Sequence, residues 1–182
     1  MHSSLLLALN GLAVLLVLAG VAWYDHTPGR MPDITPVTHT TGLVLALHPR
    51  CPCSRGTVEV LANLLPQLPP DLRVTILLTE PMEAGPDWNP GNLVDPLAGN
   101  PRILVIRDAG GRQAAALGAR TSGTVLLTTP DGIRRFTGGI TRERGDATIG
   151  QSALALIEAA RGNTMIPTPV YGCSLVLPKK NL

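Results

Sequence analysis

The sequence contains few aromatic and few charged residues for its length of 182. It has two Trp, two Tyr and one Phe, and charged residues make up only 15% of the chain. The net charge is +2, and no basic stretch is interleaved with aromatic residues. Nucleic-acid binding, which uses basic surfaces and aromatic side chains that stack on bases, is therefore not expected.

Cysteine is also scarce, with three residues in the whole chain: Cys51, Cys53 and Cys173. A small odd number excludes the dense disulfide framework of small secreted domains. Two of the three are separated by one residue and the third lies near the C-terminus, a pattern that indicates a reactive or ligating site. The alternative is a structural disulfide from Cys173 to one of the other two, since disulfides persist outside the cytosol.

Charge is absent from residues 5–22, whose only strongly polar side chain is Asn10. As a helix this segment is about 27 Å long, close to the thickness of the hydrocarbon core of a bilayer. Trp23 and Tyr24 follow at once, where interfacial aromatic residues are expected. No Lys or Arg precedes the apolar run, which disfavours a cleaved signal peptide. We therefore predict a membrane anchor over residues 1–24, with residues 5–24 in the membrane.

A very short tail before a single span and a long soluble part after it is the usual layout of an exported, anchored domain. We expect the soluble part on the extracytoplasmic side. Residues 25–41 contain three prolines, which exclude a helix and predict an extended tether. The folded domain is expected over residues 42–162, and residues 163–182 form a C-terminal extension that carries Cys173.

The domain sequence alternates short apolar runs with amphipathic stretches. Apolar runs bounded by turn residues predict buried strands, and apolar residues three and four apart predict helices. A Pro-Asp-Gly turn between two such runs predicts a hairpin. The expected elements are strand 42–48, helix 54–65, strand 72–79, strand 103–107, helix 112–117, hairpin 124–137 and helix 150–161.

This order of elements predicts an α/β domain. Parallel strands come first and an antiparallel hairpin comes late, so the sheet is mixed and helices cover both of its sides in a three-layer α/β/α arrangement. In the last helix we expect Ala153, Leu154, Ile157 and Ala160 to share the buried face.

Cys51 and Cys53 lie between the first strand and the first helix. Sites of α/β domains are built at the carboxyl ends of parallel strands. A helix N-terminus carries partial positive charge, which stabilises a thiolate and lowers its pKa. Pro52 suits the first helical turn because its missing N–H would have no partner there. With Arg50 and Arg55 nearby, the pattern predicts a reactive thiolate at one of the two cysteines.

The one-residue spacing leaves three pairings open. A disulfide between Cys51 and Cys53 would close a small, strained ring and be relatively oxidising. Alternatively, Ser54 stands in the resolving position of a Cys-Pro-x-Cys motif. In a third register Cys53 is the helix-side thiol, and Arg50 occupies the place of the attacking thiol.

Residues 47–55 resemble the His-Pro-x-Cys-Pro-Cys-[Ser/Thr]-Arg signature of the RedB-type proteins. These are membrane-anchored, thioredoxin-like bacterial proteins, related in layout to the thiol-disulfide oxidoreductases of the TlpA and ResA type. Three further stretches, 121–123, 138–145 and 169–173, resemble the same family. The resemblance implies a thioredoxin-like fold for residues 42–162 and a single span in the bacterial inner (cytoplasmic) membrane.

The resemblance also implies an activity: exchange with a thiol or disulfide of a protein substrate, without a bound cofactor. Cys51 would attack a substrate disulfide, and Cys53 or Cys173 would resolve the mixed disulfide. General thioredoxins carry a cis-proline that faces the cysteines, and Ser122 takes its place here. Loss of that proline opens this face to a metal ion. The supporting residues of the predicted site are His48, Pro52, Ser54, Arg55 and Ser122.

Two other functions stay open. Cys51 and Cys53, together with His48 three residues earlier, are soft and imidazole ligands suited to Cu(I), which favours a copper-binding or copper-delivering protein. Their spacing is not that of a zinc finger. The third reading is a non-catalytic scaffold whose disulfide is structural.

Overall fold

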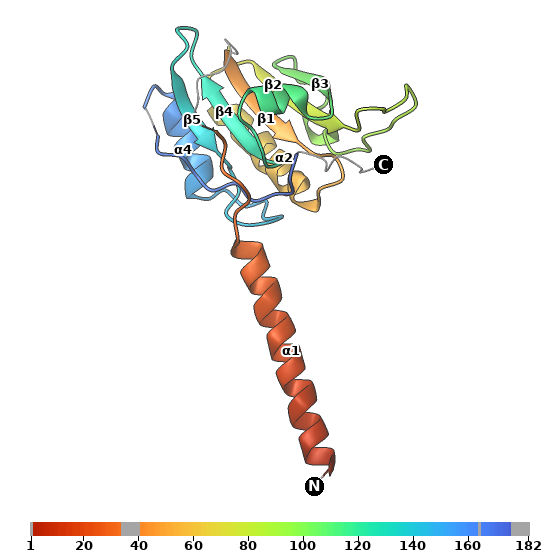
Figure 1. The fold of residues 1–182 in the computed structure, drawn as a ribbon. Coiled ribbons are helices and arrows are strands. Elements are labelled where there is room, and N and C mark those ends of the chain that lie inside the picture. Colours follow the sequence, from red (N-terminus) through yellow and green to blue (C-terminus); the bar gives the residue numbers. More distant parts are fainter. Residues whose placement is uncertain (1, 34–40, 164, 176–182) are drawn as a thin grey trace.

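The computed structural model of the chain describes residues 2–33, 41–163 and 165–175, with side chains described from residue 9. A long N-terminal helix leads into a domain built on one sheet (Figure 1). Residues 34–40 of the predicted tether and residues 176–182 of the predicted C-terminal extension lie outside the described residues.

Helix α1 (His2–His26) projects away from the domain (Figure 1). Its window Leu9–His26 has a mean hydropathy of 1.3, and none of that window is buried in the molecule. With 25 residues the helix is roughly 37 Å long, more than the hydrocarbon core of a bilayer requires. One N-terminal helix is therefore long and apolar enough to span a membrane, in agreement with the prediction.

The described strands form one mixed sheet of five, in the order β3-β2-β1-β4-β5. Strands β1 (Gly42–Leu47), β2 (Val74–Glu80) and β3 (Ile103–Ala109) run parallel to one another. Strand β4 (Thr124–Thr128) is antiparallel to β1, and β5 (Arg134–Gly138) is antiparallel to β4. The α/β class and the mixed sheet predicted from the sequence are confirmed.

Strand β1 lies at the centre of the sheet and is covered on both faces. Leu43, Leu45 and Leu47 belong to one apolar core, and Val44 and Ala46 belong to the other. This explains why β1 is a continuous apolar run instead of an alternating one.

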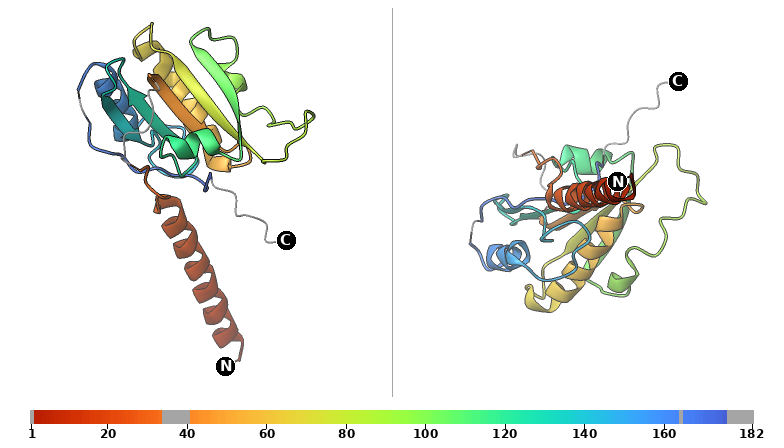
Figure 2. Two further views of the ribbon diagram at one scale, coloured as in Figure 1. Left: turned by 45° about the horizontal axis from the view of Figure 1, so that its top comes forward. Right: turned by 90° about the horizontal axis from the view of Figure 1, so that it is seen from below.

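Helices lie on both faces of the sheet (Figures 1 and 2). Helix α2 (Pro52–Leu64) and helix α4 (Gln151–Ala160) pack on one face, and the short helix α3 (Arg112–Ala116) packs on the other. Two 3-10 turns complete the described elements, η1 (Leu65–Gln67) and η2 (Asp95–Leu97).

The predicted buried face of the last helix was wrong in part. Leu154 is 45% exposed, because it lies about 100° around the helix axis from its neighbour Ala153, on the side that faces away from the sheet. Ala160 is only half-buried. The buried residues of α4 are Ala153, Leu156, Ile157 and Ala159.

The chain that follows α1 lies against the domain. The N–H of Gly29 donates to the carbonyl of Val170 at 2.7 Å, and the N–H of Asp33 donates to that of Gly118 at 2.9 Å. The Asp33 carboxylate also pairs with Arg120 at 2.7 Å. The described part of the predicted tether is therefore packed on the domain surface.

Candidate functional site

Cys51 is the residue that caps the N-terminus of α2. Strand β1 ends at Leu47, and the chain turns so that the Cys51 N–H donates to the His48 carbonyl at 3.1 Å. Pro52 occupies the first helical turn, as predicted. Both flanking thiols are buried: Cys51 is 3% exposed and Cys53 is 8% exposed.

Cys173 reaches this turn from the C-terminal end of the chain. Its segment pairs antiparallel with the residues before β4, through a bridge between Thr121 and Ser174. The Ser122 N–H donates to the Cys173 carbonyl at 2.8 Å. This pairing brings the Cys173 N–H to 3.4 Å from Cys51 Sγ, although the two residues are 122 apart in the sequence.

The close approach of this segment depends on Gly172. A Cβ atom at this position would collide with the carbonyl oxygen of Ser122, a backbone atom that cannot rotate away. Only glycine therefore fits between Tyr171 and Cys173 without displacing the segment.

Ser122 stands directly before Gly123 and β4, and its hydroxyl belongs to a small network of hydrogen bonds. The His48 N–H donates to Ser122 Oγ at 2.8 Å. Ser54 Oγ donates to the His48 carbonyl at 2.9 Å and lies 2.7 Å from Ser122 Oγ. Because the Ser54 proton is used on that carbonyl, the Ser122 hydroxyl is the donor between the two serines. The network fastens the end of β1 to the first turn of α2 and to the turn before β4.

The three thiols have different acidities. Burial raises the pKa of Cys51, but hydrogen bonds from the thiol and N–H of Cys173 outweigh it and bring the pKa below its ordinary value. Burial and the hydrogen bond to Cys51 raise the pKa of Cys173 to about 12. Burial and the charge of Cys51 raise the pKa of Cys53. Of the three thiols, Cys51 is therefore the one that ionises first, and its thiolate would accept the hydrogen bond of the Cys173 thiol.

Arg144 is the site residue that sequence reasoning missed, because its loop resembles a solvated surface turn. The interaction of its guanidinium with the Cys53 thiol opposes the rise in the pKa of Cys53. Nη1 donates to the carbonyl of Gly172 at 2.8 Å. The only signal in the sequence was the glycine-rich stretch 138–145, which contains this arginine.

Two predicted supporting residues have other surroundings. Arg55 is exposed and donates to Asn92 Oδ1 at 3.2 Å. His48 Nδ1 is buried without a hydrogen-bond partner in the described part of the chain. Burial, and then the charge of Arg50, lower the pKa of His48. Among the described residues no three His, Cys, Asp or Glu side chains are gathered closely enough to hold a metal ion.

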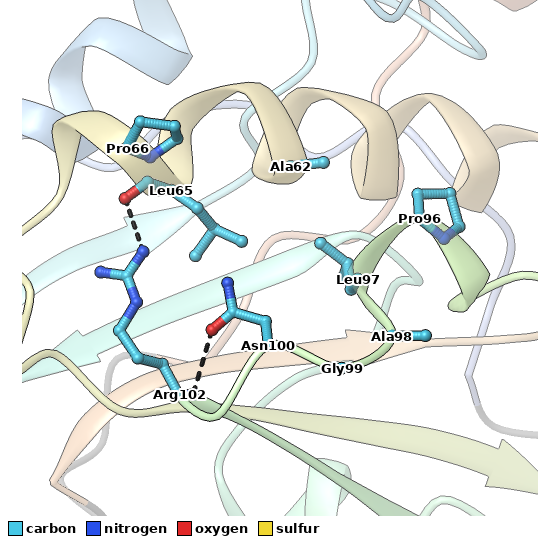
Figure 3. A pocket seen from close by; sticks show the side chains of 9 residues that line it. All are labelled: Ala62, Leu65, Pro66, Pro96, Leu97, Ala98, Gly99, Asn100 and Arg102. Atoms are coloured by element: carbon cyan, nitrogen blue, oxygen red, sulfur yellow. Dashed lines mark hydrogen bonds between the residues drawn. The ribbon is translucent and has the colours of Figure 1, made fainter.

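A pocket of about 410 Å³ lies at the other end of α2, between its last turn and η2 (Figure 3). Arg102 lines it and donates to the carbonyls of Leu65 and Pro69 at 2.7 and 2.9 Å. The bond to Leu65 satisfies a main-chain oxygen that the end of α2 leaves without an intrahelical partner, and the bond to Pro69 holds the loop after η1. The pocket contains no sulfur and belongs to the packing of the helix end.

No protein-family model and no curated protein matches the sequence. Two solved structures have a similar fold. An uncharacterized conserved protein from Geobacillus kaustophilus aligns with a TM-score of 0.58 at 15% identity, covering 85% of this chain and 94% of its own. A hypothetical protein from Sinorhizobium meliloti 1021 aligns with a TM-score of 0.56 at 17% identity, covering 85% and 93%. At these identities the likeness concerns the fold alone: an α/β domain with a mixed five-stranded sheet.

Proposed function

We propose that the protein is a membrane-anchored, thioredoxin-like thiol-disulfide oxidoreductase of the RedB type. The order β1-α2-β2 with parallel strands, followed by the β4-β5 hairpin and α4, is the order of a thioredoxin-like core. The contact that carries the proposal is the Cys173 N–H on Cys51 Sγ at 3.4 Å, at the N-terminus of α2. A thiolate held there, with a second thiol beside it, is equipped for exchange.

The reaction would run in two displacements. The Cys51 thiolate attacks one sulfur of a substrate disulfide, forming a mixed disulfide and releasing one substrate thiolate, which takes a proton from water. Cys173 then loses its proton to water and attacks the Cys51 sulfur, which releases the second substrate thiolate. The substrate gains two electrons, and the protein is left with a Cys51–Cys173 disulfide that an external dithiol reduces. The same steps in reverse would oxidise a dithiol substrate.

Cys51 is buried in this arrangement, so a protein substrate reaches it only when the C-terminal segment moves aside. Among the bonds that hold that segment are the Ser122 N–H on the Cys173 carbonyl and Arg144 on the Gly172 carbonyl, and the buried side chain of Leu175 anchors its end in the core. The opening that we propose is confined to the stretch around Cys173, with Leu175 and the sheet left in place.

The location follows from the anchor and the chemistry together. We place the span in the bacterial inner membrane and the thiols on its extracytoplasmic side, because reversible disulfides persist outside the reducing cytosol.

Reduction of a disulfide-bonded protein by dithiothreitol, with catalytic amounts of the full chain in detergent micelles, tests the proposal. We expect Cys51→Ser to abolish the acceleration, and Arg55→Gln, which changes a surface charge on the same helix, to retain it. Acceleration by the Cys51→Ser variant would refute the assignment of the nucleophile. Absence of acceleration by the wild-type chain would leave the scaffold reading. Metal analysis of protein purified without a chelator tests the copper alternative, which no contact specifically favours.

A further inference from the structure

Arg144 contacts two chain segments that are far from it in the sequence. Nη1 donates to the carbonyl of Gly172, the residue before Cys173, at 2.8 Å. Nε and Nη2 donate to the carbonyls of Tyr24 and Thr27 at 3.1 and 3.2 Å, at the end of α1. One side chain therefore joins the thiol-bearing C-terminal segment to the end of the anchor helix.

The attachment to α1 involves more than these bonds. The Arg144 guanidinium lies over the ring of Tyr24, 4.4 Å from its centre, a cation–π contact. The main-chain N–H of Arg144 donates to the carbonyl of Asp25 at 3.3 Å. Oε2 of the neighbouring Glu143 lies 2.9 Å from Nδ1 of His26. Figure 1 shows α1 leaving the domain at the end where the C-terminal segment crosses.

The same loop rests on the first turns of α2, which begins at the cysteines. A Cβ atom on Gly56 would lie 2.9 Å from the carbonyl group of Gly145, so the loop and the helix are in direct contact. From this position Arg144 reaches the Cys53 thiol as well as Gly172. The segment that it holds covers Cys51, which is 3% exposed.

We propose that Arg144 is a positioning residue that fastens the Cys173 segment over Cys51 to the end of α1 and keeps its positive charge on Cys53. The end of the anchor helix is then a structural part of the thiol site. Any effect of Arg144 on thiol-disulfide exchange rests on the proposed function. The attachment of the Cys173 segment by Arg144 does not, and it is measured on the reduced thiols alone.

The test is the alkylation rate of each cysteine in the reduced full chain in micelles, followed by mass spectrometry over a range of pH. In Arg144→Gln we expect the limiting rate of Cys51 at high pH to rise about tenfold, because its cover opens more often. The pH profile of the Cys53 alkylation rate should move to higher pH, because a neighbouring positive charge is lost. At neutral pH the alkylation rate of Cys53 then falls about threefold.

Three variants separate this role from general loosening. Arg144→Lys keeps the positive charge, so we expect the pH profile of the Cys53 alkylation rate to match that of the wild type. Cys51 should still be alkylated faster, because an ammonium group cannot bond the three separate carbonyls that the guanidinium reaches. Tyr24→Leu removes the ring but keeps the main-chain carbonyl, and we expect it to raise the alkylation rate of Cys51 about twofold. Arg142→Gln removes the same charge from an exposed side chain of the same loop and changes neither rate.

Unchanged rates in Arg144→Gln, or equal acceleration of all three cysteines, would overturn the proposal. Far-UV circular dichroism of each variant identifies a failure to fold, and Tyr24→Leu then carries the test. Exchange activity that is retained in Cys51→Ser would refute the proposed function but not the fastening by Arg144, so the two proposals can fail separately.

Discussion

The two ends of α2 differ in how their polar groups are used. At the C-terminal end, Arg102 donates to the carbonyl of Leu65 at the helix terminus and to that of Pro69 in the loop beyond it, and both contacts are structural. At the N-terminal end, the first turn lies beside two hydrogen-bonded thiols whose pKa values shift in opposite directions, that of Cys51 downward and that of Cys173 up to about 12. The pocket lies at the C-terminal end of α2, and no cysteine lines it. The difference indicates that the candidate site is marked by groups whose protonation can change and not by a pocket.

The largest expected effect on turnover is that of Cys173→Ser, which tests whether the N-terminal end of α2 is the reactive end. Without the resolving thiol the mixed disulfide on Cys51 accumulates, and turnover in the reduction assay falls about 100-fold or more. Cys53→Ser is the matched control, because it removes the nearer thiol in sequence; we expect it to keep turnover within about threefold. If Cys53→Ser is inactive and Cys173→Ser is active, the pairing is between Cys51 and Cys53.

The next effect is on the pH dependence of the thiols. A thiolate, and not a thiol, is alkylated, so the rate of each cysteine rises with pH through its own pKa. The lowered pKa of Cys51 places its rise at lower pH than that of a free cysteine, and the raised pKa of Cys173, about 12, places its rise far higher. Alkylation of the reduced chain followed per residue measures both. In Cys173→Ala the rise of Cys51 should move to higher pH, and a profile that does not move would contradict the hydrogen-bonded pair.

A smaller effect is expected from the hydroxyl network. Ser122→Ala leaves the N–H of His48 without its acceptor, at a cost of about 1–2 kcal/mol in the free energy of unfolding. Ser54→Ala removes the partner hydroxyl, and the double variant should cost less than the sum of the two single ones, since the serines bond each other. Denaturant titration of the three variants measures this coupling. Strict additivity would contradict the network.

The smallest effect on exchange is expected at the other end of α2. Arg102→Gln loses hydrogen bonds to main-chain carbonyls and should lower the free energy of unfolding by about 1 kcal/mol. Turnover in the reduction assay should not change, because the arginine lies at the end of the helix away from the sulfurs. A loss of turnover with unchanged stability would place chemistry at the pocket.

Local patterns predicted most of the fold. The continuous apolar run of β1 and the helical spacing of Val58, Leu61 and Leu64 specify their elements, because burial on two faces or on one stripe leaves a clear signature. The buried stripe of α4 was partly missed, since Leu154 and Leu156 are equally apolar and only the packing of the helix shows which of them faces the sheet.

The site was predictable only in part. A strand followed by Cys-Pro-Cys and a helix locates Cys51 at a helix N-terminus, which is a local property. The approach of Cys173 depends on pairing between chain segments about 50 residues apart, and no local pattern encodes that pairing. Arg144 was missed for the same reason, since its partners at Tyr24 and Gly172 are remote in the sequence. Long-range contacts thus decide which residues complete the site.

The pairing of the cysteines tests the account most directly. The full chain in micelles is equilibrated with a glutathione redox buffer, quenched with acid and alkylated, and the disulfide-linked peptides are identified by mass spectrometry. We expect one dominant disulfide, between Cys51 and Cys173, that forms and is lost reversibly as the redox buffer is changed, while Cys53 stays free. A Cys51–Cys53 link, or three thiols that stay free throughout, would contradict it.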